Sequence, residues 1–296
     1  MENKKRSLAT WLRLMRCSQW IKNIFVFFPL FFGHQIDDLA LTIPCLYTAL
    51  LFCPLSSAMY CLNDIMDRKT DRFHPVKRFR PIASGLVSVT EAFTVMAICL
   101  IVAFAGCLLV DLSEVLPVFV IYVALNVLYS TLLKKIAIVD ILVLSLFYII
   151  RLIAGSVATG IENSSWIILM TFLLTLLLGL GKRRDDMLKT TKTGHVLRSA
   201  TSHYSMPYVT ACMMILSGVT IVCYIMYTLS EEIVNRVGSR YLYTTGVFVL
   251  ASILRYMWHV LRNQEIGDPT YLLLHDHVIQ VCIMCWLCSF AILLYG

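Results

Sequence analysis

Long apolar segments decide what this chain can fold into. Nine stretches come close to the roughly 20 residues that a helix needs to cross a bilayer. They lie at 20–39, 40–62, 91–110, 114–132, 137–158, 166–180, 206–229, 241–260 and 273–295 of the 296 residues. Only 15% of the residues are charged, and no strand-like alternation interrupts the pattern. The sequence therefore predicts an all-α, polytopic membrane protein with nine transmembrane helices.

Lysine and arginine are distributed unevenly among the segments that connect these helices. Of the 25, 21 fall in the N-terminal tail or in every second loop, if Arg255 near the end of segment 241–260 is counted with the loop that follows it. Two fall in the intervening loops, and 2 more, Lys22 and Arg151, fall inside apolar segments. Because positively charged loops stay in the cytoplasm, we expect a cytoplasmic N-terminus and an external C-terminus. The formal net charge of +7 then belongs to a surface that faces anionic lipids or phosphates. It does not indicate a nucleic-acid partner.

Two regions follow from these patterns. Residues 1–18 combine apolar and basic side chains and predict a short interfacial helix. Residues 19–296 are expected to form one nine-helix domain. The side chains of the interfacial helix are Trp11, Leu12, Leu14 and Met15 beside Arg13 and Arg16.

The first candidate for chemistry follows the second apolar segment. Asn63, Asp64, Asp67 and Asp71 lie within about 100° of one another on a helix. Carboxylates crowded in this way repel one another unless a cation lies between them, and Mg²⁺ is the hard cation that accompanies phosphate. We therefore expect these four residues to hold Mg²⁺. A solvated segment of mixed charge is the alternative.

A dense basic segment comes directly after the acidic residues. It contains Arg72, His74, Lys77, Arg78 and Arg80. Guanidinium and ammonium groups suit phosphate oxygens. Acidic side chains for a metal beside basic side chains for an anion indicate a phosphorylated substrate.

Charged residues inside the apolar segments are further candidates. Lys22 opens the first segment, where a lysine either reaches the interface or meets a lipid phosphate. Asp140 and Arg151 share the fifth segment, but about 16 Å of helix separates them, so they cannot pair with each other. A deep arginine needs a partner or a water-filled cavity. Arg151 therefore indicates a polar interior, with an ion pair to another helix as the alternative.

The sixth segment ends in a second charged motif, Lys182-Arg183-Arg184-Asp185-Asp186. It follows an even-numbered segment, as the first motif does, and lies four segments later on the same side. This spacing indicates a duplicated four-helix unit with one polar loop in each half.

Together these features resemble the UbiA-type intramembrane prenyltransferase superfamily, and within it the decaprenyl-phosphate phosphoribosyltransferase branch. The resemblance rests on 19–23, 63–85, Tyr129-Ser130-x-x-Leu133-Lys134, Asp140, 151–155, 181–183, 268–270 and Asp276. It implies a helical bundle around a central polar cavity open to the cytoplasm, with two aspartate-rich motifs that hold Mg²⁺ and a diphosphate. One departure stands out, because carboxylates four apart are the rule in the second motif. Here Lys189 follows Asp185 at that spacing, and Thr190 follows Asp186.

The resemblance implies a Mg²⁺-dependent transfer of 5-phosphoribosyl from phosphoribosyl pyrophosphate to a polyprenyl phosphate at a bacterial inner membrane. The product would be a precursor for surface polysaccharide. Catalysis is assigned to Asp64, Asp67, Asp71 and Lys22. Substrate contacts are assigned to Lys22, Asn23, Arg72, His74, Lys77, Arg78, Arg80, Lys134, Arg151, Lys182, Arg183 and Asp186. The pattern is also compatible with an oligomer.

Two other functions remain as alternatives to this expectation. An aromatic prenyltransferase of the same fold would move a polyprenyl group from its diphosphate to an aromatic ring. A transporter or lipid-binding protein would carry out no chemistry, and its acidic segment would only bind cations.

Overall fold

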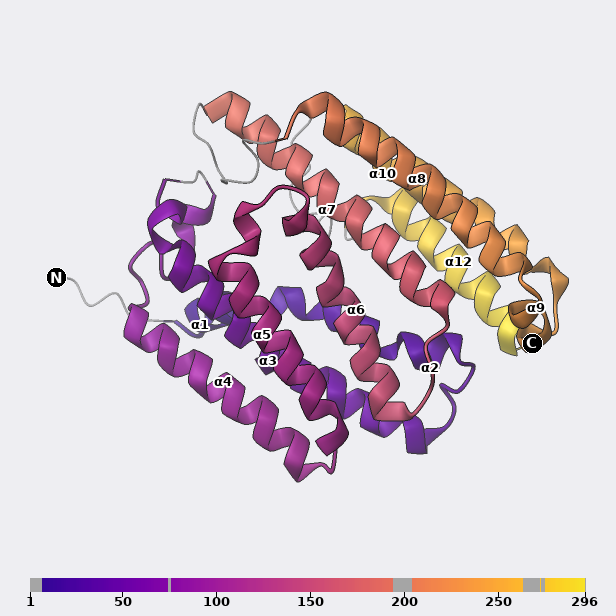
Figure 1. Cartoon of the computed structure of the whole chain (residues 1–296), viewed down its shortest axis with the longest axis horizontal. Coiled ribbons are helices and arrows are strands. Elements are labelled where there is room, and N and C mark those ends of the chain that lie inside the picture. The colour runs from indigo at the N-terminus through magenta and orange to yellow at the C-terminus, as the bar shows by residue number, and fades with distance from the viewer. Residues whose placement is uncertain (1–6, 74–75, 194–203, 263–271, 273–274, 296) are drawn as a thin grey trace. The chain divides into compact units, whose positions relative to one another are not determined.

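A computed structural model describes residues 7–73, 76–193, 204–262, 272 and 275–295, and every regular element among them is a helix (Figure 1). Within these residues, seven helices are long and apolar enough to cross a membrane. They are α3 (Leu39–Asp71), α4 (Val89–Leu109), α5 (Leu116–Thr131) with the preceding turn, α6 (Val139–Thr159), α7 (Ser165–Thr193), α8 (Met206–Leu229) and α10 (Gly246–Leu261) with the preceding turn. The predicted all-α, polytopic membrane class is confirmed.

Shorter helices complete the described part of the chain. They are α1 (Leu8–Met15), η1 (Cys17–Phe27), α2 (Phe28–Phe32), η2 (Lys77–Phe79), η3 (Ser113–Val115), η4 (Leu133–Lys135), α9 (Glu231–Val237), η6 (Arg240–Thr245) and α12 (His277–Tyr295), where η denotes a 3₁₀ helix. The first predicted apolar segment overlaps η1 and contains α2, and the last contains α12. Their apolar parts, Cys17–Phe32 and His277–Leu293, are shorter than the seven, so nine crossings remain a prediction.

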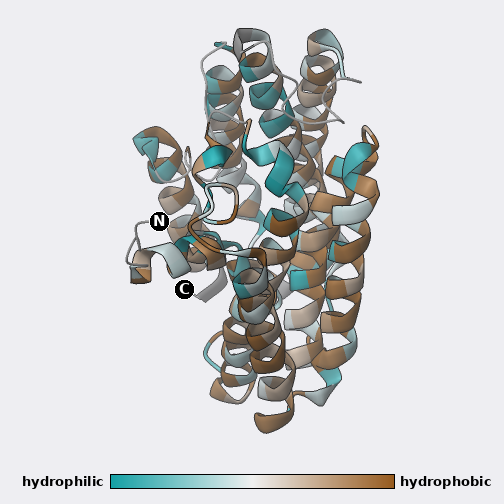
Figure 2. Ribbon diagram, turned by 90° about the vertical axis from the view of Figure 1, so that its left-hand side faces the viewer, coloured by the Kyte–Doolittle hydropathy of each residue, from teal (hydrophilic) through white to brown (hydrophobic). Residues whose placement is uncertain are grey.

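Contacts divide the chain into two compact units. Unit 1 comprises Met1–Ile136 and Leu146–Asn163, and unit 2 comprises Ala137–Ser145 and Ser164–Gly296. In unit 1, α3 packs against α4, α5 and η1 (Figure 1). In unit 2, α7 packs against α8, and α10 packs against α12 (Figure 1). The first acidic motif belongs to unit 1 and the second to unit 2. Hydrophobic residues dominate the helices along most of their length, as Figure 2 shows.

The helix α1 is tied to the core of unit 1. Leu14 is fully buried and packs with Cys61, Ile82, Val87 and Ala92. On the other side of α1, Leu8 is 73% exposed, which leaves an apolar side chain available to a membrane interface. A helix is therefore present at Leu8–Met15, and one of its faces packs on the core of unit 1, whereas its place at a membrane interface stays a prediction.

The first apolar segment differs from the expected α-helix. Cys17–Phe27 form a 3₁₀ helix, and an α-helix begins only at Phe28, with Pro29 in its first turn. Pro29 accounts for this break, because its ring would clash with the carbonyl of Phe25 inside a continuous α-helix. A 3₁₀ helix rises about 2.0 Å per residue, so Cys17–Phe32 extends about 30 Å.

The acidic motif lies on a helix that is longer than its apolar part. The sequence interpretation ends the second apolar segment at residue 62, whereas α3 continues to Asp71. Asp38 caps its start by accepting from the Ala40 N–H at 2.8 Å. The four motif residues therefore share one helical face, as the spacing predicts.

Close contact between η1 and α6 depends on a glycine. A Cβ on Gly155 would lie 1.9 Å from the backbone oxygen of Val26. We expect Gly155→Ala to lower the free energy of unfolding by about 1–3 kcal/mol or more, because the backbone at Val26 has to move. Gly218→Ala in α8 is the control, since nothing lies within 4 Å of its added Cβ. Thermal unfolding in detergent measures the stability of both variants. Equal melting temperatures for Gly155→Ala and Gly218→Ala would contradict the close contact between η1 and α6.

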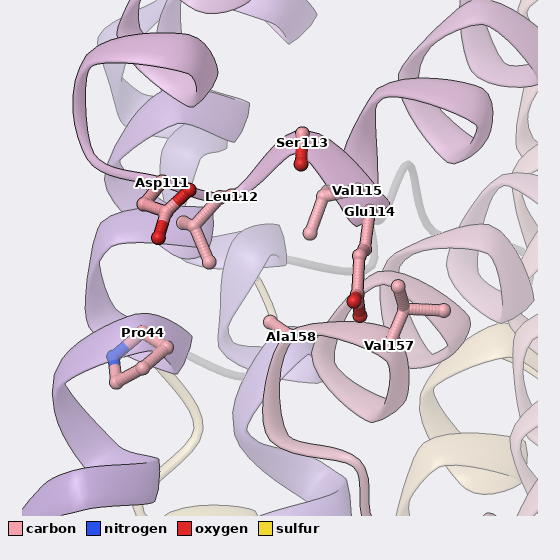
Figure 3. Close-up of a pocket in the computed structure, with 8 residues that line it drawn as sticks. All are labelled: Pro44, Asp111, Leu112, Ser113, Glu114, Val115, Val157 and Ala158. Atoms are coloured by element: carbon pink, nitrogen blue, oxygen red, sulfur yellow. The ribbon is translucent and has the colours of Figure 1, made fainter.

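A pocket of about 280 Å³ lies far from the acidic motif within unit 1 (Figure 3). It is lined by Pro44, Asp111, Leu112, Ser113, Glu114, Val115, Val157 and Ala158. Pro44 and Asp64 are 20 residues apart on α3, or about 30 Å. None of the predicted site residues lines this pocket.

Candidate active site

Three cations hold the carboxylates of the first motif in unit 1. Asp64 Oδ1 accepts from Arg16 and from Arg80 Nη1, the latter at 3.1 Å. The same Arg80 nitrogen donates to Asp71 Oδ2 at 2.6 Å. Asp67 Oδ1 accepts from Lys134 Nζ at 2.5 Å. The predicted metal residues are thus brought together with two of the predicted substrate residues.

These cations come from three different elements. Arg16 ends α1 with a left-handed φ of 51°, Arg80 follows η2, and Lys134 belongs to η4 after α5. Burial and the neighbouring Arg16 lower the pKa of Arg80, while Asp64 and Asp71 oppose that shift. A guanidinium remains charged at neutral pH nonetheless. The face of α3 therefore carries its carboxylates already paired with fixed positive charge.

Two buried oxygen atoms in this cluster have no hydrogen-bond partner. They are Asn63 Oδ1 and Asp64 Oδ2. The Asp64 side chain is only 2% exposed, so its free oxygen is not compensated by bulk water. Buried acceptors of this kind cost free energy unless a donor or a cation satisfies them.

The donor set fits Mg²⁺, which prefers carboxylate and amide oxygens. In the described residues, no three His, Cys, Asp or Glu side chains form a ready-made metal cluster. The cations explain this, because Arg80 holds Asp64 and Asp71 whereas Lys134 holds Asp67. Asn63, Asp64, Asp67 and Asp71 remain the predicted metal residues.

Arg151 is buried in unit 1 and engages all of its nitrogens. Its Nε donates to Asn23 Oδ1 at 3.0 Å, its Nη1 to the Phe147 carbonyl at 2.7 Å and its Nη2 to Tyr122 Oη at 3.0 Å. The aromatic rings of Phe52, Tyr122 and Tyr148 surround the guanidinium at 5.2–5.8 Å.

These contacts confirm that Arg151 finds polar partners, and none of the ion pairs found among the described residues includes it. Arg151 joins η1, α5 and α6 and so fixes the segment that carries Lys22, which is partly buried next to Asn23. Its role toward a lipid phosphate stays a prediction, as does that of Lys22.

The second motif forms a buried ion cluster in unit 2. Arg183, fully buried, donates from Nε to Asp140 Oδ2 at 2.5 Å and from Nη1 to Asp186 Oδ2 at 3.2 Å. Tyr204 Oη donates to Asp140 Oδ1 at 3.0 Å. Lys189 Nζ donates to Asp185 Oδ2 at 2.6 Å. As the spacing predicts, Asp140 does not pair with Arg151.

The remaining predicted residues have other surroundings. Arg72 donates to the Ala83 carbonyl at 3.3 Å, and Arg78 lies over the ring of Phe79. Lys77 and Lys182 are partly buried. His74 lies outside the described residues.

Sequence reasoning missed Arg16, Tyr122 and Tyr204 as members of these clusters. Arg16 carried one usable signal, because it lies between an amphipathic helix and the Gln19–Asn23 motif. Tyr122 and Tyr204 carried none, since their partners are distant in sequence.

Comparison with known proteins finds a matching family, relatives of similar length and a similar solved structure. Residues 25–278 match the UbiA prenyltransferase family. The chain is 31% identical to the decaprenyl-phosphate phosphoribosyltransferase of Mycobacterium tuberculosis over 94% of its own length and 92% of that protein. It is 32% identical to the protein of the same name from Corynebacterium glutamicum, over 99% and 91%. In structure it is similar to a UbiA homolog from Archaeoglobus fulgidus bound to GPP and Mg²⁺, with a TM-score of 0.70 and 17% identity over 97% of this chain and 100% of that one.

Proposed function

The chain belongs to the UbiA prenyltransferase family, and from this premise we propose that it transfers 5-phosphoribosyl from phosphoribosyl pyrophosphate to a polyprenyl phosphate. The reaction forms a bond between ribose C1 and a lipid phosphate oxygen, and it breaks the bond between C1 and pyrophosphate. The products are pyrophosphate and polyprenyl-phosphoryl-ribose 5-phosphate. The observation that carries the proposal is the nearly full-length similarity to two relatives named decaprenyl-phosphate phosphoribosyltransferase.

The first motif supplies the site for the pyrophosphate. Asn63, Asp64, Asp67 and Asp71 would hold Mg²⁺, which when bound neutralises charge on the departing pyrophosphate. Arg80 and Lys134 are fixed at these carboxylates and add positive charge at the same place. Positive charge placed in advance stabilises a leaving group without reorganisation.

The acceptor needs little activation. A phosphate monoester is ionised at neutral pH, so it can attack C1 without a general base. Attack opposite the pyrophosphate inverts the configuration at C1, which becomes oxocarbenium-like as the leaving group departs. We assign Lys77, Arg78 and Arg80, with Lys182 and Arg183, to donor phosphates, and Lys22 and Arg151 to the acceptor phosphate.

We also propose nine membrane crossings with a cytoplasmic N-terminus, in a bacterial inner membrane. The lengths of the two short apolar regions support this count: η1 with α2 extends about 30 Å, and the 19 residues of α12 extend about 28 Å. Both values approach the thickness of the hydrocarbon core. The bias of lysine and arginine supports the orientation.

Reporter fusions test the count and the orientation together. An odd number of crossings predicts that alkaline phosphatase is active when fused to the C-terminus and inactive when fused to the N-terminus. A green fluorescent protein should show the reverse. Both termini on one side would refute nine crossings.

A choice between donors tests the reaction. Purified protein with Mg²⁺ is offered either labelled phosphoribosyl pyrophosphate with polyprenyl phosphate, or polyprenyl diphosphate with labelled 4-hydroxybenzoate. We expect lipid-extractable label only with the first pair. Label only with the second pair would establish an aromatic prenyltransferase, and label with neither would favour a transporter or lipid-binding protein.

A further inference from the structure

The two acidic motifs differ in the kind of buried atom that lacks a partner. In the first motif these atoms are oxygens, Asn63 Oδ1 and Asp64 Oδ2. In the second motif the atom is a nitrogen, Arg183 Nη2, in a side chain that is fully buried. An unpaired oxygen is satisfied by a cation or a donor, whereas an unpaired guanidinium N–H is satisfied only by an acceptor such as an anionic oxygen.

Fixed protein cations already neutralise the carboxylates of the second motif. Lys189 Nζ lies 2.6 Å from Asp185 Oδ2, one helical turn away on α7. Arg183 Nη1 lies 3.2 Å from Asp186 Oδ2. The Asp185 and Asp186 side chains are 5% and 9% exposed, so both pairs are largely removed from water.

A metal ion that took the paired oxygens, Asp185 Oδ2 and Asp186 Oδ2, would have to displace these cations. Displacing Lys189 or Arg183 would leave a charged group of the protein buried without its partner, which costs about 3–5 kcal/mol. The first motif differs, because Asp64 presents an unpaired oxygen while its other oxygen keeps Arg16 and Arg80. Metal binding there can begin without breaking an existing contact.

We propose that each chain binds a single divalent cation, at the first motif. At the second motif, Lys189 and Arg183 take the place of a metal, and the buried, unpaired Arg183 N–H serves an anionic oxygen of the substrate. This inference rests on the proposed function for the identity of that anion. The number of metal ions can be tested independently of it.

Electron paramagnetic resonance of Mn²⁺ measures this number directly. Purified full-length protein in detergent is titrated with Mn²⁺ alone, and the signal of the free ion gives the number bound per chain. We expect one ion for the wild type. The Asp185→Asn variant should also bind one ion, because Asp185 pairs with Lys189 and does not bind a metal.

Lys189→Asp should bind two ions. It removes the ammonium and sets two carboxylates four residues apart on one face of α7, which opens a second site. Lys135→Asp makes the same charge change at an exposed position and should still bind one. Size-exclusion profiles and melting temperatures establish that the variants are folded.

Each of three results would overturn the inference. The wild type binds two ions, Asp185→Asn binds fewer ions than the wild type, or a folded Lys189→Asp variant binds one ion. If Lys189→Asp does not fold, the counts for the wild type and Asp185→Asn still decide. If the wild type binds two ions and still transfers phosphoribosyl, the inference fails but the proposed function holds. One that binds a single ion but transfers none would reject the proposed function alone.

Discussion

We expect Asp64→Asn to lower the rate of phosphoribosyl transfer by about 10²–10³-fold, comparable to the loss of one preorganised charge-stabilising group. The substitution keeps the shape of the side chain. Its remaining oxygen can still accept from Arg16 and Arg80, as Asp64 Oδ1 does. The new amide takes the position of Oδ2, the buried oxygen without a partner. A metal-binding acceptor is thereby exchanged for a donor.

Initial rates at saturating phosphoribosyl pyrophosphate measure this effect, with Mg²⁺ varied. Asp37→Asn, at an exposed position before α3, makes the same chemical change and should retain full activity. Melting temperatures separate lost activity from lost folding. An Asp64→Asn enzyme within twofold of the wild type would show that this carboxylate does not take part in the reaction.

We expect Arg183→Met to lower the free energy of unfolding by about 3–5 kcal/mol. Arg183 is fully buried between Asp140 and Asp186, so its loss leaves Asp140 charged in an environment that excludes water. Tyr204 still donates to Asp140, but one hydroxyl does not replace a guanidinium. This is the largest stability effect expected in unit 2.

Thermal unfolding in detergent measures this loss. Adding Asp140→Asn to Arg183→Met should recover part of it, because the unpaired charge is then removed as well. Arg13→Met, at an exposed position on α1, is the control and should change little. If Arg183→Met and Arg13→Met melt alike, the buried ion cluster does not stabilise the fold.

Local patterns predicted much of the fold. The length of the apolar segments identifies the long helices, and helical periodicity alone places Asn63, Asp64, Asp67 and Asp71 on one face. The same reasoning did not distinguish η1 from an α-helix, because an apolar segment has a similar composition in both forms. Pro29 was the one local residue that marked the break.

The contact partners of the site residues could not be predicted from such local patterns. The motif predicts Arg183 to be a phosphate ligand, but the contact of Arg183 with Asp140 joins residues 43 apart. Asn23 and Tyr122 meet Arg151 over separations of 128 and 29 residues. Such contacts depend on how helices pack, and no spacing along one helix contains that information. The unpaired atoms Asp64 Oδ2 and Arg183 Nη2 likewise become visible only in the structure.

The fate of the two halves of the donor decides whether this protein is a phosphoribosyltransferase. Phosphoribosyl pyrophosphate labelled with ¹⁴C in the ribose and with ³²P in the β-phosphate is incubated with the enzyme, Mg²⁺ and polyprenyl phosphate. We predict that ¹⁴C enters the lipid phase and that ³²P stays in the aqueous phase as pyrophosphate, in equal amounts. Transfer of ³²P to the lipid, or absence of ¹⁴C from it, would contradict the reaction proposed for the Asp64 site.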